Sequence, residues 1–418
     1  MRKHPADPVR TIAVLADDLT SAGDGAAPFR GGGHRAKVLL PEAVEPGAVP
    51  PDGVVAVDLG SRLLDEAAAV ALAGRFAEAF ARSDLLIKTV DSTLRGHVAA
   101  EVRAAHAGSR RRAVVVAPAF PAEGRTTVRG VQYVHGVPVH ETDFARDPVH
   151  PVRTADLTRL LPEAEVLEPE QFGKLPELID GGGVFVCSAA TDADLRLLVD
   201  SVPMPGDVLW VGSPGLAAAL AGRHPAVPTV RPPEPPMARR PLVVVGSANP
   251  ATRRQLDRLR PRMDVTAVEA AEAPVEGLRA LRRTAAPVLV VHTPDARRTD
   301  ARSLTADLAL FVRELVADGL VDGLVLTGGE TAVAALEALG AAGIDLVDEP
   351  EPGVARGVLL SPPHLPVLIK AGGFGDDGTL DRLLRLLMEG GPITGSPPIA
   401  ERGPVTERSP IAEGGPTS

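Results

Sequence analysis

The sequence contains only one cysteine, Cys187, among its 418 residues. An internal disulfide is therefore excluded. Because Cys187 ends the apolar run 184–187, we interpret it as a buried structural thiol rather than a reactive one. The absence of disulfides is typical of proteins from reducing compartments, so we expect a cytoplasmic protein.

Aromatic residues and positive charge are also scarce. Only 3% of the residues are aromatic, with one Trp and one Tyr, and the formal net charge is -10. Nucleic-acid-binding surfaces usually combine basic patches with stacking aromatic side chains, so we expect no nucleic acid partner. The first apolar run, at 12–16, is far shorter than the ~20 residues of a membrane span and too short for the core of a signal peptide. We therefore predict neither a membrane association nor an export signal.

Short apolar runs that alternate with helical patterns make up most of the chain. In the first half, strands are predicted near residues 11–16, 37–40, 54–58, 85–89, 113–117, 184–187 and 207–211. In the second half, strands are predicted near 242–246, 264–268, 287–291, 323–327, 344–347 and 365–370, and helices near 250–260, 300–318, 330–341 and 379–389. This alternation predicts the α/β class, with two α/β domains that each contain a mostly parallel sheet flanked by helices.

A proline-dense segment at 224–241 separates the two halves and is typical of a semi-rigid linker. We therefore predict four parts, which are a first domain at 1–228, a linker at 229–241, a second domain at 242–392 and a disordered tail, rich in Pro, Gly and Ser, at 393–418. Within the first domain, residues 132–139 interrupt the alternation and predict a β-hairpin with His135 and Gly136 at its turn.

Two polar loops follow predicted strands of the first domain. Asp17 and Asp18 come directly after the strand at 11–16, and the loop 88–96 follows the strand at 85–89. That second loop carries two cations, a carboxylate and hydroxyl groups, among them Lys88, Asp91, Ser92 and Arg95. Ligands of open α/β sheets bind outside the carboxyl ends of the strands, so the two loops predict one shared pocket for a small, anionic, hydroxylated ligand.

An ordinary structural interpretation of these loops stays open. Asp-Ser-Thr after a strand is also a common helix N-cap, and Arg95 would then be a solvated surface residue. Asp17 and Asp18 can likewise cap the helix that begins near Ala22, and we expect at least one of the two to do only that.

Three predicted strands of the second domain end in small residues. The loops are Gly246-Ser247, Gly328-Gly329-Glu330-Thr331 and Gly372-Gly373-Phe374-Gly375. Glycine lets backbone N–H groups approach a phosphate, and a following helix favours an anion, so the three loops predict a site for a nucleoside triphosphate. Glycine that serves only the conformation of a strand-to-helix turn is the alternative for each loop taken alone. The letters at 373–378 also fit a dinucleotide-binding fingerprint, which we reject because only one helix follows them.

Five longer motifs occur in the same chain. They are Ala16–Thr20, Lys88–Gly96, Ala117–Thr127, Glu141–Pro148 and Gly328–Thr331. Together they resemble the four-carbon acid sugar kinase family, from about residue 11 to about residue 390. The resemblance implies phosphorylation of a tetronate or 3-oxo-tetronate by ATP with Mg²⁺. It also implies an N-terminal domain for the sugar acid, a C-terminal domain for the nucleotide, an active site in the cleft between them and, at the family level, a homodimer.

The resemblance and the loops together give each candidate residue a role. We expect ATP to bind against Ser247, Gly328, Gly329, Glu330, Thr331, Gly372 and Gly373. We expect the acid group to bind Arg95 or Arg62, with Lys88 as the next choice, and the hydroxyls to bind Asp17, Asp18, Asp91 and Ser92. Asp17 is our first choice for the base and Asp91 the second. Arg125 either balances charge on the transferring phosphoryl group or pairs with Glu123, and the metal ligands stay open.

Three positions depart from the family pattern. Ser21 stands where glycine is expected, Ser188 replaces an aspartate, and Ala371-Gly372-Gly373-Phe374-Gly375 replaces Ser-Gly-Asn-Phe-Gly. The last departure removes a hydroxyl and an amide near the expected phosphates, although backbone donors remain. Two other functions stay open on the sequence, which are a noncatalytic sugar-acid or nucleotide sensor with the kinase fold, and a sugar-acid oxidoreductase or aldolase.

Overall fold

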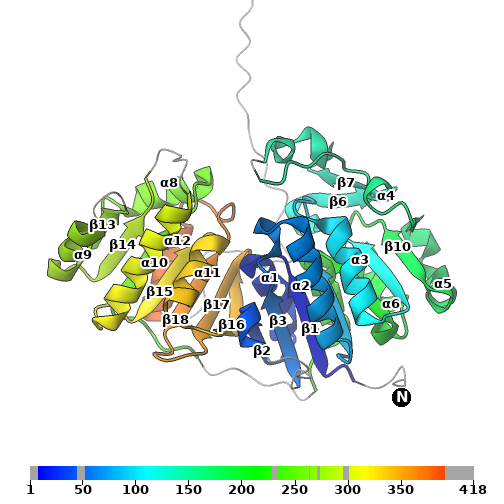
Figure 1. Cartoon of the computed structure of the whole chain (residues 1–418), viewed down its shortest axis with the longest axis horizontal. Helices are drawn as coiled ribbons and strands as arrows, with labels where there is room; N and C mark the ends of the chain where they lie inside the picture. The colour runs from blue at the N-terminus through cyan, green and yellow to red at the C-terminus, as the bar shows by residue number, and fades with distance from the viewer. Residues whose placement is uncertain are drawn as a thin grey trace, which may run out of the picture.

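A computed structural model of the chain describes residues 8–44, 52–147, 149–227, 234–262, 264–270, 274–294 and 301–390. In this part of the chain, one 15-stranded sheet runs through the whole molecule in the order β13-β14-β12-β15-β18-β17-β16-β2-β3-β1-β4-β11-β5-β10-β9 (Figure 1). Helices cover both of its faces, which confirms the predicted α/β class. None of the described helices combines the length and the apolar character needed to cross a membrane.

The first half of the chain builds one parallel section of this sheet. Its strands are β1 (Thr11–Ala16), β2 (Ala36–Leu39), β3 (Gly53–Asp58), β4 (Leu85–Thr89), β5 (Ala113–Ala117), β9 (Ala164–Leu167), β10 (Gly183–Cys187) and β11 (Val208–Gly212). One face is covered by α1 (Leu19–Gly31), α5 (Leu175–Gly181), α6 (Asp192–Asp200) and α7 (Pro214–Arg223), and the other by α2 (Glu66–Ala79) and α3 (Val98–Ser109). The central strands β1, β4, β5 and β11 are almost entirely apolar because both faces of the sheet are covered there.

A small antiparallel sheet of three strands interrupts this section between β5 and β9. Its strands are β6 (Arg125–Val128), β7 (Val131–Val134) and β8 (Val137–Pro138). His135 and Gly136 join β7 to β8 with φ angles of 48° and 81°, as a two-residue hairpin turn requires. The predicted hairpin is therefore confirmed. The short helical turns η4 (Val139–Glu141) and η5 (Asp143–Arg146) follow it.

The second half builds another parallel section. Its strands are β12 (Pro241–Val245), β13 (Val265–Glu269), β14 (Val288–His292), β15 (Gly323–Thr327) and β18 (Pro366–Lys370). The helices α9 (Pro274–Arg283), α10 (Ala301–Ala317) and α11 (Gly329–Ala338) cover one face, and α8 (Pro250–Leu259) and α12 (Thr379–Glu389) cover the other. Residues 229–233 of the predicted linker lie outside the described residues. So do the last two residues of the predicted second domain, 391 and 392, and the whole predicted tail, 393–418.

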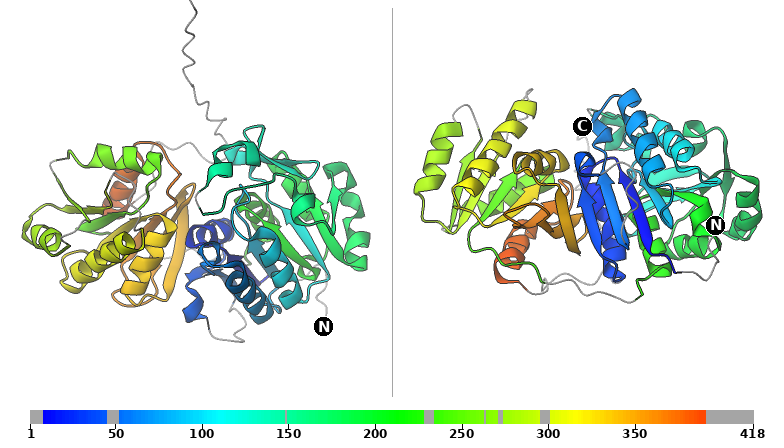
Figure 2. Two further views of the ribbon diagram at one scale, coloured as in Figure 1. Left: turned by 45° about the horizontal axis from the view of Figure 1, so that its top comes forward. Right: turned by 60° about the horizontal axis from the view of Figure 1, so that its bottom comes forward.

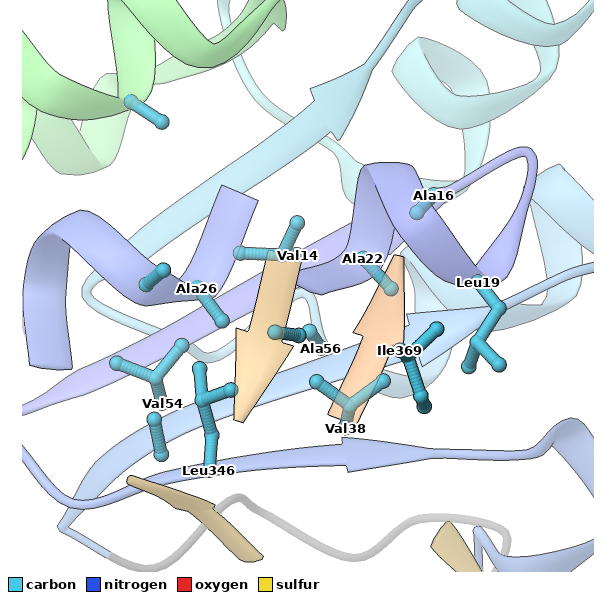
Figure 3. Packing of buried hydrophobic residues seen from close by; sticks show 14 of the residues in the cluster. Val14, Ala16, Leu19, Ala22, Ala26, Val38, Val54, Ala56, Leu346 and Ile369 are labelled. Carbon is cyan, nitrogen blue, oxygen red and sulfur yellow. The ribbon is translucent and has the colours of Figure 1, made fainter. Parts of the chain in front are cut away.

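The two sections are joined by antiparallel strands. β16 (Gly343–Glu351) pairs with β2 on one side and with β17 (Val354–Leu359) on the other, and β17 then pairs with β18. Two further views show the elements of the two halves side by side (Figure 2). One hydrophobic core continues across this joint (Figure 3). It includes Val14, Ala22 and Val38 from the first half and Leu346 and Ile369 from the second. The sequence predicted two sheets, whereas the structure joins them into one.

The joint also decides where the loops of the two halves lie. Because β16, β17 and β18 alternate in direction, the parallel strands of the two halves run in opposite directions along the sheet. Each strand of a twisted sheet is rotated by roughly 20–25° from its neighbour, so the six steps from β1 to β15 add roughly 120–150°. This rotation offsets most of the reversal. The carboxyl ends of β1 and β15 are thereby turned toward the same side of the molecule.

We expect Gly343→Ala to weaken the joint between the halves. Gly343 begins β16 with a φ of 148°, and a Cβ there would lie 2.0 Å from the carbonyl oxygen of Val38 on β2. The free energy of unfolding, measured in urea, should fall by more than about 2 kcal/mol. Gly340→Ala is the matched control, because its φ is 61° but a Cβ there meets nothing within 4 Å. It should cost only about 1 kcal/mol, and equal losses for the two variants would contradict the prediction.

Candidate active site

Arg62 holds the two adjacent aspartates of the first loop. Asp17 follows β1 directly, Asp18 is the N-cap of α1, and Arg62 lies in the short turn after β3. The Nε of Arg62 donates to Asp17 Oδ2 at 2.8 Å, and its Nη1 forms an ion pair with Asp18. Asp18 Oδ1 also accepts the backbone N–H of Ser21 at 2.7 Å. Asp18 therefore caps the helix, as the structural interpretation expected of one aspartate, and pairs with Arg62 as well.

Asp17 differs from Asp18 because it keeps a buried oxygen without a partner. Its side chain is 3% exposed, and in the described part of the chain nothing hydrogen-bonds to its Oδ1. Burial alone would raise the pKa of Asp17, but the charges of Arg62 and Lys88 outweigh this effect and hold the pKa below its ordinary value. Asp17 is therefore a buried carboxylate whose lowered pKa favours the ionised form and whose Oδ1 has no partner in the described part of the chain.

The second loop is organised around Asp91. Its Oδ2 accepts the Nε of Arg95 at 2.6 Å, the backbone N–H of Arg95 at 3.2 Å and the hydroxyl of Thr93. Burial opposes ionisation of Asp91, but Arg95 and Arg62 together bring its pKa far below the ordinary value. The Nη1 of Arg95 also lies 3.6 Å from Asp147, and its guanidinium lies over the ring of Phe144.

Gly96 brings the two loops into contact. A Cβ built on this residue would lie 3.5 Å from Asp17 Oδ2 and 3.8 Å from Arg62 Cγ, and its φ of 91° favours glycine. The backbone carbonyl of Ser92, in the same loop, accepts the side-chain amide of Gln132 from β7 at 2.7 Å. The loops that follow β1 and β4 are thus adjacent, and Gln132 of the hairpin holds the loop after β4 by its hydrogen bond to Ser92.

Lys88 occupies a different environment from the other cations. Its ammonium is 1% exposed, forms an ion pair of 2.8 Å with the equally buried Glu101 of α3, and donates to the carbonyl of Thr89 at 2.8 Å. A buried lysine that already has a carboxylate partner is poorly placed to clamp a second one. Arg62 and Arg95, which are 16% and 29% exposed, are the accessible cations of these loops.

Three residues near these loops were not among the sequence candidates. Asp58, at the end of β3, is 2% exposed, and burial together with the nearby aspartates raises its pKa to about 7 although the N–H of Gly60 hydrogen-bonds to it. His150 hydrogen-bonds through its Nε2 with the carbonyl of Arg62, and Asp147 faces Arg95. The last two come from the segment after η5. Asp147 belongs to the motif Glu141–Pro148, but the motif alone does not indicate that it faces Arg95.

Arg125 and the departures Ser21 and Ser188 have definite partners. The Nη1 of Arg125 donates to Glu123 Oε2 at 3.1 Å, so the ion pair that competed with a phosphoryl role is present. Its buried Nε has no partner in the described part of the chain. Ser21 Oγ accepts a weak hydrogen bond from Arg62 at 3.3 Å. Ser188 is buried and donates to Glu168 at 2.7 Å, in the region of β9 and β10.

The three glycine loops of the second half converge on Ser247. A Cβ on Gly372 would lie 2.2 Å from Ser247 Oγ, and a Cβ on Gly328 would lie 3.6 Å from Ser247 Cβ. Gly328 has a φ of 92° and leads into α11, whose first turn contains exposed Glu330 and buried Thr331. The loops at the carboxyl ends of β12, β15 and β18 therefore lie next to one another around Ser247.

The aspartate loop and the glycine loops meet at the joint between the halves. A Cβ on Gly329, at the start of α11, would lie 3.9 Å from the methyl group of Thr20, at the start of α1. Two half-buried carboxylates lie nearby, Asp24 on α1 and Glu349 on β16. Burial and their mutual repulsion raise the pKa of Asp24 well above its ordinary value, and burial with the charge of Glu123 raises that of Glu349 to about 7.

Two family patterns match the chain. The pattern described as "Sugar-binding N-terminal domain" matches residues 12–220, and the pattern described as "Nucleotide-binding C-terminal domain" matches residues 242–380. The first contains the aspartate loops and the second contains the glycine loops.

Several relatives of known activity span nearly the whole chain. The D-threonate kinase of Salmonella typhimurium is 32% identical over 88% of this chain and 96% of its own length. The D-threonate kinase of Bordetella bronchiseptica is 35% identical over 90% of this chain and 98% of its own length. Other matches, from Heliobacterium modesticaldum at 28% and Burkholderia multivorans at 27% identity, are named D-erythronate kinase and 3-oxo-tetronate kinase.

A solved structure from Salmonella typhimurium LT2 has the same fold. It matches this chain with a TM-score of 0.75 and 21% identity, and it covers 90% of this chain and 99% of its own. A Haemophilus influenzae protein matches with a TM-score of 0.69 and 19% identity, over 88% of this chain and 98% of its own. At these identities the likeness concerns the fold alone.

We expect Asp58→Asn to stabilise the protein increasingly as the pH rises. The pKa of Asp58 in the folded state is about 7 against an ordinary 3.8, so folding favours its protonated form. That contribution is present at low pH and is lost as the pH rises from about 4 to about 7. Asparagine keeps an acceptor for Gly60 and carries no charge. Its advantage in the free energy of unfolding should grow by about 2–3 kcal/mol between pH 5 and pH 8.

Urea unfolding at the two pH values measures this difference. Asp52→Asn is the matched control, because Asp52 lies just before the same strand but is exposed. An advantage of Asp58→Asn that is the same at pH 5 and pH 8 would contradict the prediction.

Proposed function

The chain belongs to the four-carbon acid sugar kinase family, and we propose that it transfers the γ-phosphoryl group of ATP to the terminal (4-) hydroxyl of D-threonate. Membership of this family identifies the protein as a sugar-acid kinase. ATP as the donor, Mg²⁺ as the metal and D-threonate as the acceptor are our proposals. D-threonate is chosen because the relatives that share 32–35% identity over about nine tenths of this chain carry that name, whereas those named for other acids share 27–28%.

The contact between Thr20 and Gly329 is the observation that carries the proposal. It joins the N-terminus of α1, which follows the aspartate loop, to the N-terminus of α11, which follows a glycine loop. Phosphoryl transfer requires the attacking hydroxyl and the terminal phosphate to be held close together and in line. A hydroxyl bound at the aspartates and a phosphate bound at the glycines would be neighbours here.

The acid group is proposed to bind Arg95, with Arg62 beside it. A guanidinium can bind a carboxylate through two parallel hydrogen bonds, which fixes the orientation of the ligand. Arg95 is the more exposed of the two and uses its Nε for Asp91. Arg62 already bridges Asp17 and Asp18, so its first role is to hold the carboxylates that face the hydroxyls. Asp91 and Ser92 complete the proposed hydroxyl contacts.

Asp17 is the proposed acceptor of the proton from the attacking hydroxyl. Oδ2 of Asp17 accepts one hydrogen bond, from Arg62, and its Oδ1 accepts none in the described part of the chain, whereas Oδ2 of Asp91 accepts three hydrogen bonds from its own loop. The lowered pKa of Asp17 makes it a weak base that is always ionised. A weak base suffices in a reaction that depends mainly on positioning and on neutralising phosphate charge.

The residues of the second half fit the phosphates of a nucleotide. The hydroxyl of Ser247 occupies the space that a Cβ at position 372 would need, so position 372 requires glycine and contributes only backbone groups to the loop. Mg²⁺ usually takes one or two carboxylates and completes its shell with phosphate and water oxygens. In the described part of the chain, no group of three or more His, Cys, Asp or Glu side chains could hold a metal by itself. Mg²⁺ bound together with the phosphates fits this arrangement, and it would neutralise their charge.

We expect turnover with D-threonate to exceed turnover with related acids. An ATP-to-ADP coupled assay with Mg²⁺ would compare D- and L-threonate, D- and L-erythronate and their 3-oxo forms. Loss of one hydrogen-bonded hydroxyl contact typically costs at least tenfold, so kcat/KM for D-threonate should be more than about tenfold above the others. Turnover with another acid of the panel would correct the substrate, and no turnover with any acid despite nucleotide binding would favour the noncatalytic sensor.

We expect Asp17→Asn to abolish turnover and spare binding. Asparagine keeps a hydrogen-bond acceptor for Arg62 but cannot take the proton, so kcat should fall by roughly 100- to 10,000-fold. The dissociation constant for the acid, measured by calorimetry, should change less than about fivefold. Asp91→Asn is the comparison, because it frees Arg95 and should weaken binding of the acid more than it lowers kcat. A kcat above a tenth of the original in Asp17→Asn would exclude Asp17 as the base.

A further inference from the structure

Lys370 is a buried cation that the function described above leaves without a role. It ends β18, its side chain is 0% exposed, and its Nζ donates to Thr252 Oγ1 at 3.2 Å and to the carbonyl of Ala371 at 2.9 Å. Lys88 is its counterpart in the first half, because it also lies at the end of a central strand and also binds the carbonyl of the next residue. Lys88, however, is neutralised by Glu101 at 2.8 Å.

No such partner exists for Lys370 in the described part of the chain. Glu351 on β16 is the carboxylate whose charge reaches it, and both oxygens of Glu351 are taken by Arg382 of α12, at 2.6 and 2.9 Å. The helix α8 contributes the neutral side chain of Thr252. A buried charge is costly unless it is paired, so an unneutralised ammonium at the edge of an anion site calls for an explanation.

Lys370 fixes the orientation of two peptide groups in the loop that follows it. It binds the carbonyl of Ala371 directly, and it reaches the next carbonyl through Thr252, whose hydroxyl donates to Gly372 O at 2.7 Å. In a trans peptide the N–H points away from the preceding C=O. Holding the carbonyls of Ala371 and Gly372 toward the buried lysine therefore turns the N–H groups of Gly372 and Gly373 away from it.

Those two N–H groups are available to a ligand. In the described part of the chain, neither donates a hydrogen bond, and Gly373 is exposed. They lie beside Ser247, at the place where the three glycine loops converge. Two successive backbone donors above a positive charge form a concave anion site of the kind that binds phosphates.

We propose that Lys370 is the positioning residue of the nucleotide site, which orients the N–H groups of Gly372 and Gly373 toward the nucleotide phosphates and places an unneutralised charge beneath them. This inference rests on the proposed binding of ATP at the glycine loops. It also accounts for the departures at 371 and 373. With alanine and glycine there, the loop has no side-chain donor of its own, and the fixed backbone supplies the donors instead.

The proposal has a pH dependence that follows from the burial of the lysine. Burial lowers the pKa of Lys370 to about 8, and the charge of Glu351 offsets this only in part. The ammonium is present below this pH and is deprotonated above it, so the positive charge is lost and the two donated hydrogen bonds, then made by a neutral amine, become weaker. A bound polyphosphate should raise the pKa again, because it favours the charged form. Affinity for ATP should therefore fall as the pH rises through about 8.

The experiment measures ATP dissociation constants by calorimetry between pH 7 and pH 9.5. The unaltered protein should bind ATP at least fivefold more weakly at pH 9.5 than at pH 7. Lys370→Met should bind at least tenfold more weakly at pH 7 and show no further loss at high pH. In the kinase assay it should raise KM for ATP much more than it lowers kcat. Its melting temperature should not fall, because the variant no longer buries an unpaired charge.

Two further variants keep the outcome decisive. Thr252→Val removes only the two hydrogen bonds that link Lys370 to the carbonyl of Gly372, so it should weaken ATP binding about threefold or more and keep the pH dependence. This variant tests the inference even if Lys370→Met does not fold. Arg385→Met removes an exposed charge from α12 and should change affinity less than twofold. Unchanged ATP affinity at every pH in both Lys370→Met and Thr252→Val would overturn the inference. Failure of the unaltered protein to bind ATP would instead overturn the proposed nucleotide site, and the inference with it.

Discussion

The antiparallel pairing of β16 with β2 is the constraint on which the arrangement of this molecule depends. It makes one sheet from two parallel sections and lets a single core continue from β1 and α1 into β18 and α11. Without it, the two sets of loops would belong to separate bodies. The strand reversals at β16, β17 and β18 set the two sections in opposite directions, and the twist of the sheet turns them back toward each other. The close approach of Gly329 to Thr20 is the result.

Charge is arranged differently on the two sides of this contact. In the first half, cations and carboxylates are paired, with Arg62 on Asp17 and Asp18, and Arg95 on Asp91. Such pairs suit a small ligand that carries one negative charge and several hydroxyls, because both kinds of group are presented together. In the second half, the glycine loops carry backbone donors and lie beside a buried lysine that has no carboxylate partner of its own in the described part of the chain. That arrangement suits the proposed ligand with several negative charges.

The sequence predicted most of the elements and much of the site, and the errors have physical reasons. Strands with strong apolar runs, such as 11–16, 85–89 and 323–327, were placed to the residue, because burial on both faces makes most of their positions apolar. The strands β9 and β17 were missed because they contain polar residues such as Glu165 and Arg356, and β16 extends through the polar segment 348–351. The joining of the two sheets could not be predicted, since pairing between distant strands leaves no local signal.

Candidate site residues that directly follow a strand could be named from the sequence, whereas residues that reach the same loops from elsewhere were not among the candidates. Asp17, Asp91 and Gly372 stand at strand ends, where the rule for open α/β sheets applies. Asp147 and His150 reach the same loops from a long excursion after the hairpin, and Lys370 appears in sequence as the last residue of an apolar strand. The interpretation of Lys370 depends on the side chain that faces its ammonium group. Glutamate faces Lys88 and threonine faces Lys370, so two lysines with similar sequence surroundings differ in whether a carboxylate pairs with them.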